Sequence, residues 1–274
     1  MDYHLPQSLE EALGLLAEGG VAPIAGGTDF YPAMGAGGPV ASLVDLTRIR
    51  GLRGISQDAT GGWRIGAATR WSDIVAADLP PAFDGLKAAA REVGSIQIQN
   101  AGTVAGNLCN ASPAADGVPP LLVLQADVEL ARAGETRRMP LGEFIKGVRR
   151  TALEPGELVV ALHIPAIPEG MVGRFSKLGS RKYLVISIAM AAVLVSKDAG
   201  GRIDGARVAV GACSPVAQRL PELEAAMIGQ LAGDVVVTDA HLSPLSPIDD
   251  VRGSAGYRLG AVKELLQRLI GEQA

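Results

Sequence analysis

Residues 23–30 read Pro-Ile-Ala-Gly-Gly-Thr-Asp-Phe, and residues 100–116 read Asn-Ala-Gly-Thr-Val-Ala-Gly-Asn-Leu-Cys-Asn-Ala-Ser-Pro-Ala-Ala-Asp. Both segments combine glycine, small hydroxyl residues and Asp or Asn after an apolar, strand-like run. Glycine lets backbone N–H groups approach a ligand closely, and such donors in a loop suit phosphate oxygens. Two loops of this kind predict a diphosphate held from both sides, as in a dinucleotide cofactor bound between two lobes.

The composition is that of a globular protein with room for two domains: 274 residues, 48% hydrophobic and 20% charged. A net charge of −4 without runs of like charge, and an aromatic content of 4%, disfavour nucleic-acid binding. The longest apolar stretch, residues 184–195, contains Ser187 and is too short to span a bilayer. The N-terminal residues do not resemble a signal peptide, so a cytoplasmic protein is expected.

Redox chemistry would need a group that the amino-acid side chains of this sequence do not supply. Cys109 and Cys213 cannot form a disulfide framework or supply the four thiolates of a usual iron–sulfur cluster. The three histidines are scattered and show no metal-ligand spacing. We therefore expect no metal site, and assign redox chemistry to an organic cofactor or another chain.

Apolar periodicity and turn residues divide the chain into two parts. The first part is expected to contain helices at 9–18, 83–92 and 119–124, strands at 21–25, 42–46, 128–131 and 156–165, and a hairpin over 52–67. Pro165, Pro168 and Gly170 indicate a linker. Beyond it, strands are expected at 172–178, 186–196 and 203–212, and helices at 220–228 and 254–270. The fold class predicted is α+β, with a domain over 1–165 (lobes about 1–52 and 53–165) and a smaller one over 171–274.

The glycine segments do not match the better-known nucleotide motifs. The chain has no G-x-G-x-x-G opening a helix and no G-x-x-x-x-G-K-[ST], which disfavours a Rossmann unit and a P-loop. Either segment alone could be an ordinary turn, because the chain has 35 glycines. Their pairing, and the unusual length and polarity of the second, favour a ligand site.

These segments resemble the two flavin-binding signatures of one family, the FAD-carrying medium subunits of molybdenum hydroxylases of the xanthine and carbon monoxide dehydrogenase types. Residues 174–182, 211–219 and 254–258 are similar to later signatures of the same family, so the resemblance covers essentially the whole chain. It implies a two-lobed FAD-binding domain of the PCMH, or vanillyl-alcohol-oxidase-like, kind. A C-terminal domain of antiparallel sheet plus helices would follow.

Two positions depart from the family pattern. The second signature usually has a glycine where this chain has Ala105, which is tolerable at negative φ and costly at positive φ. The family usually has an arginine where this chain has Gln99. Some relatives also carry an inserted four-cysteine cluster, which is absent here.

The resemblance implies a role for each matching residue. The cofactor-binding set would be Ile24, Ala25, Gly26, Gly27, Thr28, Asp29, Phe30, Ala101, Thr103, Gly106, Asn107, Asp116, Leu158, Val159 and Lys177. The first loop, with Thr103, Gly106 and Asn107, would hold the pyrophosphate and a ribose through N–H and hydroxyl groups. Asp116 would accept a hydrogen bond from a ligand hydroxyl, or else cap the following helix. Leu158 and Val159 would line the flavin ring, or else be plain core. Lys177 would lie at the ring's polar edge, or else be a solvated lysine.

The family's function would then be electron transfer. Substrate would be oxidised at a molybdenum cofactor on a large subunit, and electrons would reach this FAD through [2Fe-2S] clusters on a small subunit. The complex would be a dimer of heterotrimers that reduces an external acceptor. Two alternatives are a self-sufficient FAD oxidoreductase and a scaffold that has lost its flavin. Outside the motifs, Cys109 is expected to be a small buried thiol, and Trp63 and Trp71 core or domain-contact residues.

Overall fold

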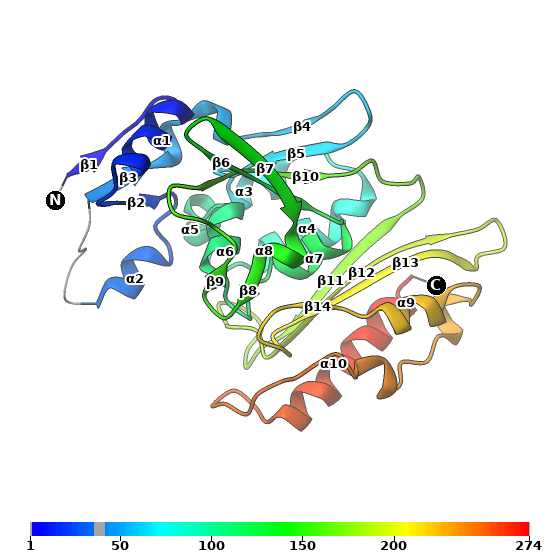
Figure 1. Ribbon diagram of the computed structural model, residues 1–274. Helices are drawn as coiled ribbons and strands as arrows, with labels where there is room; N and C mark the ends of the chain where they lie inside the picture. Colours follow the sequence, from blue (N-terminus) through cyan, green and yellow to red (C-terminus); the bar gives the residue numbers. More distant parts are fainter. Residues whose placement is uncertain (1, 36–41, 274) are drawn as a thin grey trace.

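A computed structural model describes residues 2–35 and 42–273 of the chain. The first lobe is a small parallel sheet in the order β1-β3-β2, drawn in blue in Figure 1. Its elements are β1 (Tyr3–His4), α1 (Leu9–Glu18), β2 (Val21–Ile24), α2 (Phe30–Met34) and β3 (Ser42–Asp45). Helix α1 begins as predicted, because the Ser8 hydroxyl accepts a hydrogen bond from the Glu11 N–H. It ends at Gly19, which has a φ of 80°.

The second lobe is an antiparallel sheet in the order β4-β5-β10-β6-β7, with helices packed beside it (Figure 1). Its strands are β4 (Ile55–Gln57), β5 (Trp63–Gly66), β6 (Asp127–Arg132), β7 (Glu135–Pro140) and β10 (Leu158–Ile164). Its helices are α3 (Trp71–Ala76), α4 (Asp84–Glu92), α5 (Ile96–Ala101), α6 (Val104–Asn110), α7 (Val118–Val123) and α8 (Leu141–Phe144). A separate ribbon pairs β8 (Ile145–Gly147) with β9 (Arg150–Thr151). Side chains of α1 and β3 share a core with Leu158 and Val160 of β10, which joins the two lobes.

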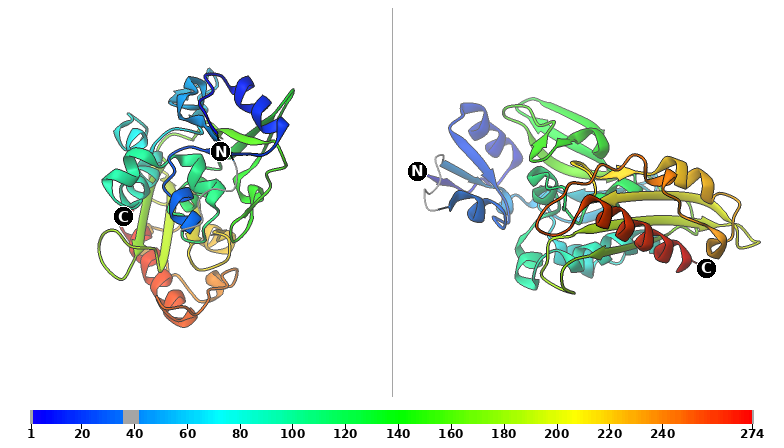
Figure 2. Two further views of the ribbon diagram at one scale, coloured as in Figure 1. Left: turned by 90° about the vertical axis from the view of Figure 1, so that its left-hand side faces the viewer. Right: turned by 90° about the horizontal axis from the view of Figure 1, so that it is seen from below.

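The C-terminal part is an antiparallel sheet in the order β11-β12-β13-β14. Its elements are β11 (Val172–Leu178), β12 (Ala189–Lys197), β13 (Ile203–Gly211), β14 (Gln218–Arg219), α9 (Pro221–Met227) and α10 (Ala255–Gly271). Figure 2 shows α10, in red, lying along this sheet, and the first lobe projecting at the other end of the molecule. Residues of β12 alternate between a core shared with α9 and α10 and a core shared with α4 and α7. This two-sided burial explains why the sequence of β12 is apolar without alternation.

Two expectations about local structure were wrong. The second glycine segment is not one long loop, because residues 96–101 and 104–110 form α5 and α6. Strand β7 was missed, because its sequence, Glu-Thr-Arg-Arg-Met-Pro, is polar at an exposed sheet edge. In the described part of the chain, no helix is both long and apolar enough to cross a membrane.

Candidate functional site

The two glycine segments lie side by side and line one cleft. Its central cavity, of about 380 Å³, is lined by all residues from Ile24 to Phe30 and by Thr103, Gly106 and Asn107. An apolar cavity of about 140 Å³ adjoins it and shares Ala25, Thr103 and Gly106 with it. A wider cavity of about 470 Å³ adjoins the centre on the side of Thr28, Asp29 and Asn107. The two outer cavities share no lining residue, so they lie at different ends of the cleft.

The first segment is a tight turn whose backbone faces the cleft. Gly27 has a φ of 68°, and a Cβ placed on Gly26 would lie 2.1 Å from the Ala101 carbonyl oxygen, so both positions require glycine. The four N–H groups of residues 26–29 have no hydrogen-bond acceptor among residues 2–35 and 42–273. Adjacent donors of this kind in a turn form an anion-binding surface.

The second segment has little free backbone. Thr103 is the N-cap of α6, and its hydroxyl accepts a hydrogen bond from the Gly106 N–H at 3.2 Å. The N–H groups of Val104 and Ala105 donate to the carbonyls of Thr69 and Ala67. This segment therefore contributes shape and side chains rather than N–H donors to the cleft. The departure at Ala105 costs nothing in backbone strain, because this residue is helical and its φ is not positive.

Side chains connect the two segments and leave one polar atom for a ligand. The Asn110 amide donates to Asp29 Oδ1 at 2.8 Å, and Asn110 Oδ1 accepts a hydrogen bond from Arg149. The Oδ1 atom of Asn107 is buried and has no hydrogen-bond partner in the described structure. Because Asn107 lines the central and the wide cavities, this acceptor can be satisfied by a ligand hydroxyl.

An ion pair lies at the wide end of the cleft. Lys177 Nζ lies 2.9 Å from Asp116 Oδ2, and its side chain is only 5% exposed, so it is not a solvated lysine. Ser187 donates to Asp116 Oδ1 at 2.7 Å. Burial raises the pKa of the Asp116 carboxyl, and the opposing charge of Lys177 lowers it. Asp116 lines the cavity but does not cap α7, whose N-cap is Gly117.

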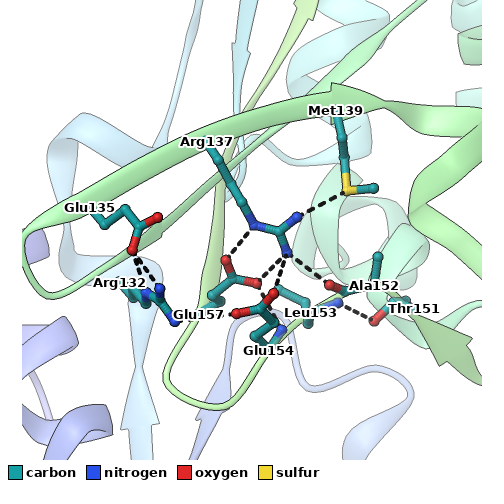
Figure 3. A network of polar contacts seen from close by, with 9 residues as sticks. All are labelled: Arg132, Glu135, Arg137, Met139, Thr151, Ala152, Leu153, Glu154 and Glu157. Carbon is teal, nitrogen blue, oxygen red and sulfur yellow. Dashed lines mark hydrogen bonds and ion pairs between the residues drawn. The ribbon is translucent and has the colours of Figure 1, made fainter.

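Leu158 and Val159 lie at the other, apolar end of the cleft. Both are buried in β10 and line the small cavity together with Glu157, which immediately precedes the strand. Both carboxylate oxygens of Glu157 accept hydrogen bonds from Arg137, as Figure 3 shows. This guanidinium holds the pKa of the Glu157 carboxyl below its usual range.

The structure adds cleft residues that the sequence did not indicate. Val93, Ile98 and Arg149 line the wide cavity, although they lie outside both glycine segments. Cys109 is exposed and lines the central and small cavities, so the expectation of a buried thiol was wrong. Cys109 lies in the last turn of α6, which borders the cleft. Trp71 is buried in the core as expected, at 1% exposure. Ala101 contributes its carbonyl to the contact with Gly26 and lines none of the three cavities.

Comparison with known proteins identifies the class of this site. Residues 1–167 match the family described as FAD binding domain in molybdopterin dehydrogenase, and residues 174–273 match the CO dehydrogenase flavoprotein C-terminal domain. The 6-hydroxypseudooxynicotine dehydrogenase complex subunit alpha of Paenarthrobacter nicotinovorans is 32% identical over 99% of this chain and 93% of its own. The glyceraldehyde dehydrogenase medium chain of Sulfolobus acidocaldarius is 31% identical over 99% and 98%.

Solved structures agree with these sequence relatives. A chain of the carbon monoxide dehydrogenase from Hydrogenophaga pseudoflava superposes with a TM-score of 0.88 at 28% identity, over 98% of this chain and 95% of that chain. The chain belongs to the family of FAD-binding subunits of molybdopterin dehydrogenases. These matches confirm the family resemblance and the α+β fold, a two-lobed FAD-binding domain followed by a C-terminal domain. They also confirm FAD as the cofactor and the oxidoreductase class.

Proposed function

We propose that this chain is the electron-transfer flavin subunit of a molybdenum-containing hydroxylase. The observation that carries the proposal is the row of free N–H donors in residues 26–29, which face a cleft between two lobes. FAD supplies the chemistry, because its isoalloxazine ring accepts and releases one or two electrons. The residues of this chain bind the cofactor, orient it and set its surroundings.

The residues of the cleft fit an extended dinucleotide. The central cavity takes the diphosphate, because residues 26–29, whose N–H groups are free, line it and Gly106 leaves room for close approach. The unpartnered Oδ1 of Asn107 accepts from a sugar or ribityl hydroxyl. These assignments keep Ile24 to Phe30, Thr103, Gly106 and Asn107 in the roles that the family resemblance implies, with Ala101 positioning Gly26.

The two ends of the cleft take the two ring systems. The wide cavity suits the larger isoalloxazine. Lys177 does not line this cavity, but it is paired with Asp116, which does, and from behind that carboxylate its positive charge stabilises reduced flavin. Asp116 keeps accepting capacity for a ligand hydroxyl, because each carboxylate oxygen has two lone pairs. The small apolar cavity suits adenine. We therefore assign Leu158 and Val159 to the adenine end, rather than to the ring end expected from the resemblance.

The partners and location follow from the family resemblance. The substrate would be oxidised on a large subunit with a molybdenum cofactor, and a small subunit with [2Fe-2S] clusters would pass the electrons to this chain. We propose a cytoplasmic dimer of heterotrimers that delivers electrons to an external acceptor. Domain boundaries at 165 and 171, with the lobes meeting near residue 52, remain part of this proposal.

The cofactor and the partners can be tested on the purified protein. We expect about one FAD per chain, held without a covalent bond, because Cys109 lies near the expected diphosphate and away from the ring. Acid precipitation should release all the yellow colour into the supernatant, and purification from the native source should recover two further chains. Colour that stays in the precipitate would contradict the noncovalent assignment, and a flavoprotein recovered alone would contradict the subunit role.

A further inference from the structure

We propose that Arg137 and Glu157 form a positioning pair that holds one wall of the apolar cavity and thereby sets the affinity for the adenylate half of the cofactor. The proposal rests on the proposed function, since it takes this cavity as the adenine site. Neither residue belongs to the two glycine segments. Their effect would be a preference for FAD over FMN, which has no adenylate half.

The pair has the geometry of a strong, fixed contact. Arg137 Nε donates to Glu157 Oε1 at 2.7 Å, and Nη2 donates to Oε2 at 2.8 Å (Figure 3). A bidentate guanidinium–carboxylate pair fixes orientation as well as distance. The Glu157 side chain is 3% exposed, so its charge depends on this partner rather than on water.

The same two residues fasten the whole segment that forms the wall. Arg137 Nη2 also donates to the Ala152 carbonyl at 2.9 Å, and the Glu154 N–H donates to Glu157 Oε2 at 2.7 Å. The segment from 152 to 157 is thus fastened to strand β7 at both of its ends. Leu153 within it, and Leu158 and Val159 directly after it, all line the apolar cavity.

Loss of the pair would move this wall. Without Arg137, the Glu157 carboxylate would be buried and unpaired, so it would turn toward water or bind a proton. Either change would loosen the turn that bears Leu153 and leads into Leu158 of β10. The wide cavity shares no residue with this wall, so binding of the flavin ring should not change.

A neighbouring ion pair provides a matched control. Arg132 Nη2 lies 2.5 Å from Glu135 Oε2 in the same β6–β7 hairpin, but the two side chains are 43% and 54% exposed. Exposed pairs of this kind contribute little. Glu135→Gln therefore removes a carboxylate from the same hairpin without touching the cavity.

The experiment is to strip the full-length protein of cofactor and titrate it with FAD, FMN and ADP. Glu157→Gln should weaken FAD and ADP by the same factor, about tenfold or more, and leave the Kd for FMN within about twofold. Arg137→Lys keeps the positive charge but loses the bidentate guanidinium contact. It should therefore give a smaller loss of FAD and ADP affinity and leave FMN affinity unchanged. Glu135→Gln should bind all three ligands like the wild type.

The outcomes separate this inference from the proposed function. Equal loss of FAD and FMN affinity, or unchanged FAD affinity in a folded Glu157→Gln protein, would overturn the positioning role. If Glu157→Gln does not fold, the comparison is made with Arg137→Lys, and equal loss for FMN there would overturn it too. A wild-type protein that binds FMN and FAD equally well would overturn the inference while leaving a flavin site in place. A wild-type protein that binds no flavin would overturn the proposed function itself.

Discussion

The two glycine segments are similar in sequence but contribute to the cleft in different ways. In residues 25–30 the backbone itself faces the cavity, and the N–H groups of residues 26–29 lack acceptors in the described structure. In residues 104–110 the backbone N–H groups are satisfied within helix α6, by its cap Thr103 and by the carbonyls of Thr69 and Ala67, so the surface is shaped by Gly106 and the Asn107 side chain. Glycine content therefore does not by itself identify a phosphate cradle. What identifies it is which N–H groups the fold leaves free.

The largest effect is expected from Gly26→Ala. A Cβ at this position would meet the Ala101 carbonyl oxygen at 2.1 Å, so the two segments would have to separate. We expect complete loss of FAD together with a destabilisation of about 2 kcal/mol or more, measured by denaturant unfolding. As a control, Gly14→Ala in helix α1 meets no atom within 4 Å and should stabilise the chain by about 0.5–1 kcal/mol. A Gly26→Ala protein with wild-type stability would show that the close contact is not needed.

Lys177→Met tests the far end of the second segment. Removal of Lys177 leaves the Asp116 carboxylate buried without a positively charged partner. We expect the free energy of unfolding to fall by about 3 kcal/mol at pH 7. The flavin reduction potential should also become more negative, because a cation beside the ring is lost. Lys263→Met, which breaks a pair with the 91% exposed Asp239, should cost less than about 1 kcal/mol. Equal losses in the two variants would contradict the distinction between a buried and an exposed pair.

Gly106→Val should separate binding from folding. Its Cβ meets only the Thr103 hydroxyl, at 2.9 Å, and this group can rotate at a cost of about 1 kcal/mol for a weakened cap. The side chain would project into the cavity, so the protein should fold but lose its flavin. Absorbance in the visible flavin bands and a melting curve measure the two effects. A substitution at Gly37, which belongs to neither segment, would be an obvious control, but Gly37 lies outside the described residues. Gly14→Ala serves as the control instead. A yellow Gly106→Val protein would mean that the second segment does not approach the cofactor.

The smallest effect is a pH dependence at the Arg137–Glu157 pair beside the small apolar cavity. The pKa of Glu157 is lowered in the folded chain by its hydrogen bonds from Arg137, so the pair stabilises the fold above the ordinary glutamate pKa. This contribution is lost as the pH falls through the folded pKa. The difference in melting temperature between wild type and Glu157→Gln should therefore be constant above about pH 5 and shrink below it. A difference that grows on acidification would contradict the assignment of a charged carboxylate.

Much of the fold was predictable because its local signals agree with its tertiary structure. Ser8 and Ser254 cap the helices that the sequence pattern places after them. The sequence predicts strands β11, β12 and β13 to within a few residues of their ends. The sequence of α6, Val-Ala-Gly-Asn-Leu-Cys-Asn, predicts a loop rather than a helix, because it has little helix propensity. Its N-terminal N–H groups are instead fixed by the carbonyls of Ala67 and Thr69, which are distant in sequence.

The site was predictable in its centre and less so at its ends. The motifs brought together Ile24 to Phe30, Thr103, Gly106 and Asn107, all of which line one cavity. The separation of Leu158 and Val159 from Lys177 was not predictable, because it depends on which side of the cleft β10 and β11 approach. Arg149 carried no sequence signal at all. It reaches the cleft because the turn between β8 and β9 places it beside Asn110.

The electron-transfer role is tested most directly by mixing the purified, FAD-loaded chain, in the absence of oxygen, with purines, aldehydes, N-heterocycles and hydroxy acids. Lys177 is buried and paired with Asp116, so neither residue is a free base beside the ring. We predict that none of these compounds bleaches the flavin, whereas dithionite does, and that bleaching by the physiological substrate requires the partner chains. Rapid bleaching by any one of the compounds with this chain alone would contradict the electron-transfer role and show a self-sufficient oxidoreductase.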